Sequence, residues 1–315
     1  MILNKVKKVK FRDYGVTIGF LIICIIISIA SPTFLSKRNI LNLLRQSSII
    51  GIISAGMTFV IISGNFDISV GAVAALAGAI TMKLATLEVP LILAMLAAIA
   101  VSAVIGLING FFVSKVRVPS LIATMAMVTI VRGLLLMITG GYPITQEFKL
   151  LNFLGSEYIL GIPVPVILFF IVVLISHIVL TKTKFGRHVF SVGGNQEASK
   201  LNGINVDAYK IKVFVINAVL AAIAGIVLTG RLGTATAIAG EGYDMDAIAS
   251  VVIGGTSVTG GSGSAIRTVV GVLLMGVINN SFNLLSVNIY FQYILKGLII
   301  LIAVGADSYS KNKLA

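Results

Sequence analysis

The chain has 315 residues, of which 57% are hydrophobic and 11% are charged, and its formal net charge is +13. Because soluble domains carry about 25% charged residues, this composition is that of a protein embedded in a lipid bilayer. The basic residues lie in loops beside apolar runs and do not alternate with aromatic residues. This pattern argues against a nucleic-acid surface and fits the excess of Lys and Arg on the cytoplasmic side of membrane proteins.

Apolar runs along the chain predict an all-α polytopic membrane protein with about ten transmembrane segments. A spanning helix needs about 20 residues, and the runs lie, in chain order, at 14–31, 40–62, 68–84, 90–113, 119–139, 160–181, 210–230, 245–256, 265–284 and 289–305. The eighth run is short and ends in Gly254 and Gly255, so it is either a full span or a re-entrant half-helix. No linker or low-complexity tract interrupts the sequence, and residues 1–315 are expected to form one transmembrane domain.

The N-terminal segment resembles a secretory signal peptide, because an apolar run follows the basic residues Lys5, Lys7, Lys8, Lys10 and Arg12. We interpret it as an uncleaved first helix, since the run is long and Pro32 follows it. With the N-terminus in the cytoplasm and ten crossings, fifteen of the 24 Lys and Arg residues lie inside and five outside. The positive-inside rule favours this orientation. Both termini and the loop at 182–209 are then cytoplasmic, whereas the loops at 140–159 and 231–244 face outward.

Several kinds of functional site are not indicated by the sequence. Cys24 is the only cysteine, and no His or Cys spacing is typical of a metal site. No Ser-His-Asp set or credible pair of carboxylates predicts catalytic residues. The Gly-rich run at 254–264 lacks the Gly-Lys-Ser/Thr of a phosphate loop, as does the whole chain. We therefore expect no ATP hydrolysis in this chain, and the run is either a flexible turn or a contact surface for a cytoplasmic partner.

Polar residues between the second and third apolar runs are the first candidates for a transport pathway. Asp67 lies there with Asn65 and Ser69, and a carboxylate in a membrane is costly unless it is hydrogen-bonded or wet. These residues either shape a pathway at a break between helices, or Asp67 caps the N-terminus of the following helix. The two roles are compatible. A weak echo of this segment, 64–69 (GNFDIS), occurs at 242–246 (GYDMD).

A second group of pathway candidates lies near the end of the ninth run. It consists of neutral amides, which suit a polyol because they offer donors and acceptors without fixed charge: Asn279, Asn280, Asn283 and Gln292, with Asn288 beside them. Asn279, Asn280 and Asn283 share a helix face, although hydrogen bonds between helices explain the amides equally well.

Two charged residues lie within predicted spans. Arg132 is expected to pair with a carboxylate or with carbonyl groups freed by Gly133, and snorkelling to the interface suffices to explain Lys296.

The long polar loop between the two apolar halves contains a short helix signal. The run Glu197 to Leu201 is expected to be helical, beginning near Asn195 and ending at Gly203. Such a helix fits a groove on a soluble partner. A solvated basic loop that only fixes the topology accounts for the composition about equally well.

Runs along nearly the whole chain resemble the permease subunits of bacterial ABC sugar importers, in the ribose and simple-sugar branch that also includes autoinducer-2 permeases. The matching runs are specific together, although none is so alone: 39–45 (NILNLLR), 56–61 (GMTFVI), 64–71 (GNFDISVG), 106–110 (GLING), 118–124 (VPSLIAT), 132–133 (RG), 185–188 (FGRH), 193–195 (GGN), 203–206 (GINV), 247–249 (AIA) and 252–257 (VIGGTS). Two positions depart from the pattern. Asn65-Phe66 replace a Gly followed by Ile, and Arg267 replaces a small residue.

The resemblance implies a translocation pore made of two permease copies or of this chain and a paralogue, in the inner or sole plasma membrane of a bacterium. It implies two cytoplasmic ATPase modules that bind ATP and Mg²⁺, and an extracytoplasmic binding protein that delivers the sugar. Coupling to the ATPase then falls on the matching loop, at Arg187, Gly194, Asn195, Glu197, Ala198, Leu201 and Gly203. Membrane lipid is the remaining expected partner.

One rival function remains open from the sequence, a stand-alone secondary transporter of small polar solutes driven by an ion gradient. It would need buried carboxylates for ion coupling, and Asp67 is the only candidate inside the apolar blocks of the middle sequence. A scaffold or enzyme without transport activity has no sequence feature in its favour.

Overall fold

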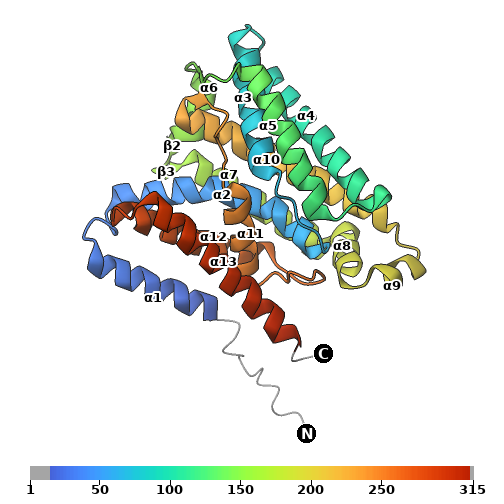
Figure 1. The fold of residues 1–315 in the computed structure, drawn as a ribbon. Coiled ribbons are helices and arrows are strands. Elements are labelled where there is room, and N and C mark those ends of the chain that lie inside the picture. The colour runs from blue at the N-terminus through green and yellow to red at the C-terminus, as the bar shows by residue number, and fades with distance from the viewer. Residues whose placement is uncertain (1–14, 313–315) are drawn as a thin grey trace.

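The computed structural model of the chain describes residues 15–312, so the basic cluster at residues 5–12 lies outside the described residues. Within that range the chain forms thirteen α-helices, one π-helix and two short strand pairs (Figure 1). The helices are α1 (Gly15–Ala30), α2 (Lys37–Ile62), α3 (Val70–Thr86), α4 (Leu91–Phe111), the π-helix η2 (Phe112–Val116), α5 (Ser120–Thr139), α6 (Lys149–Ser156), α7 (Val164–Lys182), α8 (Lys184–Gly194), α9 (Gln196–Leu201), α10 (Val206–Leu232), α11 (Tyr243–Ile253), α12 (Ala265–Leu284) and α13 (Ile289–Asn312). The strands are β1 (Ile144–Thr145), β2 (Tyr158–Ile159), β3 (Ile162–Pro163) and β4 (Thr234–Ala235), paired antiparallel as β1 with β4 and β2 with β3.

Between residues 15 and 312, six helices are long and apolar enough to cross a bilayer: α2, α4 with η2, α5, α7, α10 and α12. Shorter apolar helices lie at Ile18–Ala30, Val70–Thr86 and Ile289–Ile302. At 1.5 Å per residue, α11 is only about 17 Å long, roughly half the thickness of the hydrocarbon core. The prediction of an all-α membrane protein is confirmed and the eighth segment is a half-length helix, whereas the count of ten crossings stays a prediction.

α10 is the central helix, packed against α2, α3, α4 and α6. The core lies where α2, α3 and α10 meet, around the fully buried side chains of Met57, Leu76 and Phe214. Glycine allows the closest contacts, since a Cβ built on Gly225 of α10 would lie 1.9 Å from the carbonyl oxygen of Ala74 on α3. Small residues let helix backbones approach one another in this way in a bilayer, where lipid is as apolar as the side chains.

Loops lie at both ends of α10. The helix has 27 residues, so its two ends are about 40 Å apart. At its first end lies α8, where His188 Nδ1 and Tyr209 Oη of the first turn of α10 form a hydrogen bond at 2.6 Å. At its last end β1 pairs with β4. The loop at 140–159 therefore lies far from the loop at 182–205, which agrees with their predicted placement on opposite sides.

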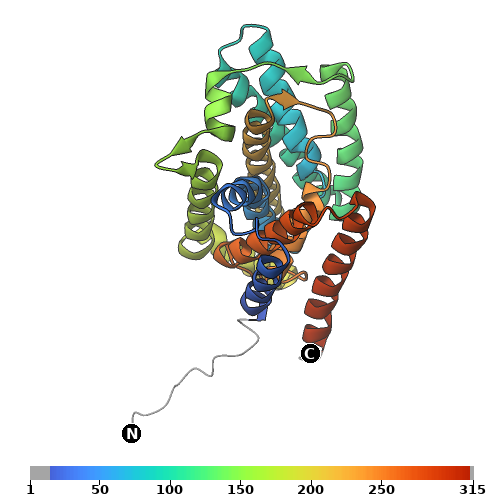
Figure 2. The same cartoon turned by 90° about the vertical axis from the view of Figure 1, so that its left-hand side faces the viewer.

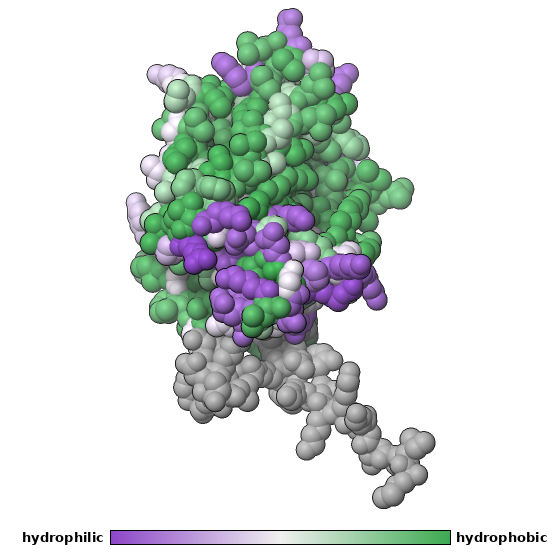
Figure 3. All heavy atoms as spheres, turned by 90° about the vertical axis from the view of Figure 1, so that its right-hand side faces the viewer, coloured by the Kyte–Doolittle hydropathy of each residue, from purple (hydrophilic) through white to green (hydrophobic). Residues whose placement is uncertain are grey.

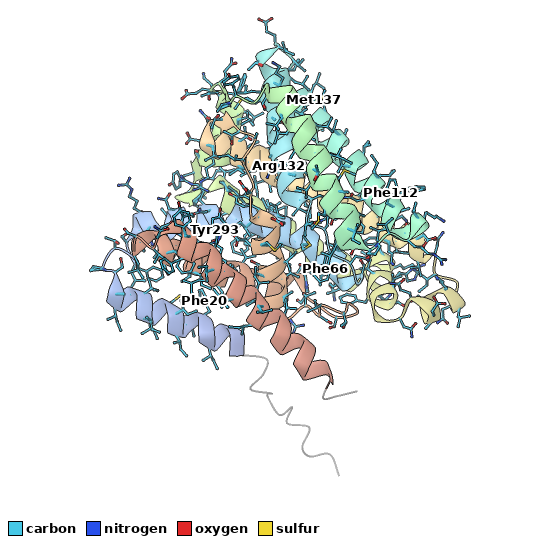
Figure 4. The ribbon with its side chains drawn as sticks, viewed as in Figure 1. Phe20, Phe66, Phe112, Arg132, Met137 and Tyr293 are labelled. Carbon is cyan, nitrogen blue, oxygen red and sulfur yellow. The ribbon has the colours of Figure 1, made fainter. Side chains whose placement is uncertain are left out.

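The segment between α10 and α11 turns back into the bundle. The carbonyl oxygen of Gly240 reaches the start of α3, where a Cβ built on Gly71 would lie 2.2 Å from it. Arg132 of α5 donates from Nη1 to the carbonyl oxygens of Ala237 and Ala239 (Figure 4). Because backbone groups inside a membrane must be satisfied by protein, this arginine supports the non-helical backbone that precedes the half-length helix.

We expect Gly225→Ala to lower the free energy of unfolding by about 1–3 kcal/mol, because the new methyl group overpacks the contact between α3 and α10. The matched control is Gly133→Ala in α5, where nothing lies within 4 Å of the new Cβ. An exposed helical Gly→Ala change is neutral or stabilising by about 0.5–1 kcal/mol. Melting temperatures of the two detergent-solubilised variants check this, and equal values would contradict the packing argument.

Candidate functional site

The loop between α7 and α10 forms two helices, α8 and α9. Asn195 caps α9, because its Oδ1 accepts the amide hydrogen of Ala198 at 2.9 Å. α9 ends before Gly203, which has a φ of +76° and donates its amide to Lys200 O at 2.9 Å. The predicted helix between Asn195 and Gly203 is confirmed, whereas α8 was not expected. Its glycines disfavour a helix in isolation, but packing buries one face of it, including Val189 and Val192.

The residues predicted to contact an ATPase share one property, which is exposure to solvent: Arg187, Gly194, Asn195, Glu197, Ala198, Leu201 and Gly203. Leu201 is 90% exposed at the end of α9, and it is the one large apolar residue of that helix. Glu197 pairs with Lys200 at 3.2 Å on the same surface. Figure 3 shows a hydrophilic patch on the side of the molecule where α8 and α9 lie, below a broad apolar surface. We name the exposed residues from Lys184 to Gly203, which form α8, α9 and their ends, the α8–α9 surface.

Asp67 lies in a buried polar node that joins three helices. Its Oδ1 accepts from the amide of Ser69 at 2.9 Å and from Ser69 Oγ at 2.6 Å, and its Oδ2 accepts from Asn217 Nδ2 of α10 at 3.0 Å. Asn109 of α4 donates to Ser69 Oγ at 3.0 Å. α3 begins at Val70, so Asp67 closes a turn ahead of the helix instead of capping its first turn. Asn65 donates locally, to the main-chain and side-chain oxygens of Ser63.

A second buried node lies at the start of α11. Asp246, which is 4% exposed, accepts through Oδ2 from Asn279 Nδ2 of α12 at 3.1 Å and from Lys296 Nζ of α13 at 3.2 Å. Lys296 therefore reaches a carboxylate inside the bundle, and the expectation that snorkelling explains it is corrected. Among residues 15–312, neither Asp246 Oδ1 nor Asn279 Oδ1 has a hydrogen-bond partner, although both are buried.

The two nodes have the same arrangement of a carboxylate and an asparagine. Each carboxylate lies just before or within the start of a shorter helix and accepts a hydrogen bond from an asparagine on a long one. The weak echo between 64–69 and 242–246 thus has a structural counterpart. Residues that flank the two segments also meet, since Gly71 and Gly240 touch through their backbones.

The amides predicted to share a helix face do not form one site. Asn280 exchanges two hydrogen bonds with Asn39 of α2, at 2.9 and 2.8 Å. Gln292 donates to Val287 O at 2.9 Å, and Asn283 is exposed. Only Asn279 reaches a buried polar node, because one step along a helix turns a side chain by about 100°.

Several contributors escaped the sequence interpretation, above all Asn217, Asn109 and Asp246. Asn217 and Asn109 each interrupt an apolar helix, and Asp246 opens an apolar run; a polar side chain at such a position is the signal that could have found them. Arg132 does bind carbonyl groups, as one expectation had it, but they belong to the distant 236–242 segment. Within the described residues, no three His, Cys, Asp or Glu side chains gather closely enough to hold a metal ion.

The chain is similar to permease components of known transport systems. The family described as the branched-chain amino acid transport system permease component matches residues 39–304. The chain is 44% identical to the ribose import permease protein RbsC of Bacillus subtilis, over 94% of this chain and 92% of that protein. It is 42% identical to RbsC of Haemophilus influenzae, over 94% and 93% of the two chains.

A more distant relative carries a different sugar in its name. The xylose transport system permease protein XylH of Haemophilus influenzae is 35% identical, over 98% of this chain and all of that protein. No solved structure matches the chain. Since the family match and the aligned relatives both cover most of the sequence, the chain belongs to this family of membrane permease components, in the ribose and simple-sugar branch that its motifs resemble.

Proposed function

We propose that this chain is the pore-forming permease subunit of a bacterial ABC importer for ribose or a closely related monosaccharide. The observation that carries the proposal is the α8–α9 surface, on which every predicted coupling residue is exposed and the apolar Leu201 is uncovered. A soluble ATPase that docks there binds ATP and Mg²⁺ and hydrolyses the nucleotide. No observation favours an ion-coupled transporter, since Asp67 is fully hydrogen-bonded and Asp246 is paired with Lys296.

Ribose is the favoured substrate because relatives named for ribose import are 41–44% identical, against 33–35% for those named for xylose. An extracytoplasmic binding protein delivers the sugar, and a second permease copy or a paralogue completes the pore. The protein resides in the inner or sole plasma membrane of a bacterium.

The orientation follows from charge. The α8–α9 surface and its surroundings are basic, with exposed Lys182, Lys184 and Arg187, and basic loops stay in the cytoplasm. Both termini are then cytoplasmic, with ten crossings that include the half-length α11. The binding protein docks at the other end of α10, where β1, β4 and α6 lie.

The candidate pathway residues fall into two groups, those whose hydrogen-bonding groups have partners within the chain and those with an unpartnered acceptor. Asn65, Asp67, Ser69, Asn280 and Gln292 have partners within the chain. The buried amide oxygens of Asn109, Asn217 and Asn279 lack a donor among residues 15–312, and so does Asp246 Oδ1, the one carboxylate oxygen in this group. Sugar hydroxyl groups are donors, and a carboxylate oxygen is the strongest of these acceptors. We place the polar contact of the pathway at Asp246, Asn279 and Lys296.

The import function is tested by reconstituting the chain in proteoliposomes with an ABC ATPase and a sugar-binding protein from the same organism. We expect uptake of radiolabelled ribose that requires ATP, resists ionophores and is inhibited more by unlabelled ribose than by xylose. Uptake that ignores ATP and collapses with an ion gradient would establish the rival transporter instead.

Reversing one charge on the α8–α9 surface tests coupling. We expect Glu197→Arg to insert normally and to lower ATP-driven uptake about tenfold, because a charge of the wrong sign faces the ATPase. Glu147→Arg, an exposed reversal between β1 and α6, is the control for retention of the ATPase during purification. Unchanged uptake by Glu197→Arg would remove Glu197 from the docking surface.

The pathway contact is tested with Asn279→Ala at saturating binding protein. We expect the uptake rate to fall about fivefold, since a hydrogen bond to a neutral group contributes about 1 kcal/mol. The control is Asn42→Ala, which removes an exposed asparagine of α2. Equal rates in the two variants would take Asn279 out of the pathway.

A further inference from the structure

α8 touches its neighbours through backbone at Gly193. A Cβ built on Gly193 would lie 1.7 Å from the carbonyl oxygen of Ile62, the last residue of α2, and 2.8 Å from the amide nitrogen of Gly261. Distances this short cannot be relieved by turning a side chain, because both neighbouring atoms are main-chain atoms. Gly193 was not among the predicted coupling residues.

The Gly-rich loop at 254–264 supplies the other side of this contact. Gly261 donates its amide to Ile62 O at 2.9 Å, and a Cβ on Gly260 would lie 2.9 Å from Gly193 O. Gly260 and Gly261 have φ values of +84° and +73°, which glycine adopts without strain. We name Gly193, Gly260, Gly261 and the carbonyl group of Ile62 the glycine joint.

The Gly-rich loop is compact, not a flexible turn. The amide of Ser257 donates to Ser262 O at 3.0 Å, and that of Gly260 donates to Ser257 O at 3.0 Å. Thr256 and Ser257 are buried, at 1% and 2% exposure. A displacement at the glycine joint is therefore carried through the loop and is not absorbed within it.

α11 leads directly into this loop. The amide of Thr256 donates to Val251 O at 3.2 Å, so the loop is bonded to the last turn of the helix. The other end of α11 carries Asp246, bound to Asn279 and Lys296. One short helix thus joins the glycine joint to the second polar node, and α13, to which Lys296 belongs, lies at the edge of the bundle (Figure 2).

α10 is the alternative connection from α8, through the hydrogen bond between His188 Nδ1 and Tyr209 Oη at 2.6 Å. However, α10 is held to α3 and α4 at backbone distance, as Gly225 and Gly106 show. Moving it would disrupt the core of the bundle. α11 also meets α12 at backbone distance, at Gly271, but it is short, begins after a loop and is hydrogen-bonded to the Gly-rich loop of the joint.

We propose that the glycine joint couples movement of the α8–α9 surface to α11, and through it to the Asp246–Asn279–Lys296 node. Gly193, Gly260 and Gly261 are positioning residues, since they touch neither nucleotide nor sugar. The inference rests on the proposed function, because it assumes that an ATPase moves α8.

The first test compares Gly193→Ala with Gly133→Ala in the complete reconstituted transporter. We expect Gly193→Ala to retain the ATPase during purification but to lower the sugar imported per ATP hydrolysed about tenfold. Gly133→Ala, whose new Cβ meets nothing within 4 Å, should match the parent. If Gly193→Ala does not reach the membrane, Gly260→Ala takes its place, because its closest contacts are longer, at 2.9 Å.

The second test reports on α11 itself. Met245, in its first turn, is 46% exposed. The variant Met245→Cys in a Cys24→Ser background would place a single reactive thiol there. Addition of ATP to the complex should change the rate of maleimide labelling at residue 245 about twofold or more. Gly193→Ala should abolish this change and Gly133→Ala should preserve it.

The outcomes separate the two proposals. A parent complex without ATP-driven uptake contradicts the proposed function. If the parent transports, the glycine joint is refuted by normal coupling in Gly193→Ala, or in Gly260→Ala where that replaces it. It is equally refuted by labelling at residue 245 that ignores ATP.

Discussion

Contact between backbones without intervening side chains is the constraint on which this structure depends. Apolar side chains gain little by leaving lipid for a helix interface, so close packing must hold the helices together. At Gly225 the central α10 meets α3 in this way, and at Gly193 α8 meets both α2 and the Gly-rich loop. The same device that makes the bundle compact thus also fastens its polar surface helix to the membrane core.

Buried carboxylates determine where the shorter helices begin. Asp67 and Asp246 each face an asparagine on a long neighbouring helix, and the hydrogen bonds offset the cost of placing a carboxylate away from water. Both carboxylate oxygens of Asp67 have donors, although the amide oxygens of Asn109 and Asn217 beside them lack a partner among residues 15–312. The Asp246 node is open at the carboxylate itself, because Asp246 Oδ1, like the amide oxygen of Asn279, lacks a partner among the described residues. This difference makes the second node the better place for a passing solute.

The α8–α9 surface, the glycine joint and α11 are connected one after another, and this order suggests how the protein works. The α8–α9 surface is polar and exposed, the glycine joint behind it is rigid, and α11 spans the distance to the open node. Arg132 stabilises the backbone ahead of α11, so the half-length helix begins inside the bundle and the carbonyl groups of Ala237 and Ala239 before it have a donor. The arrangement suits a permease that receives mechanical work from a soluble subunit.

Composition, apolar runs and local capping residues determined the class of protein, most helices and the short helix between Asn195 and Gly203. These features depend on neighbours within a few positions, which the sequence shows directly. Only the tertiary structure decided that Lys296 pairs with Asp246 and that Gly193 lies against Ile62. It also decided that Asn279 and Asn280, although adjacent, bind different partners. The physical reason is that lipid and helix interfaces are equally apolar, so hydrophobic pattern does not reveal which faces meet; glycines and lone polar residues decide it through contacts far apart in the chain.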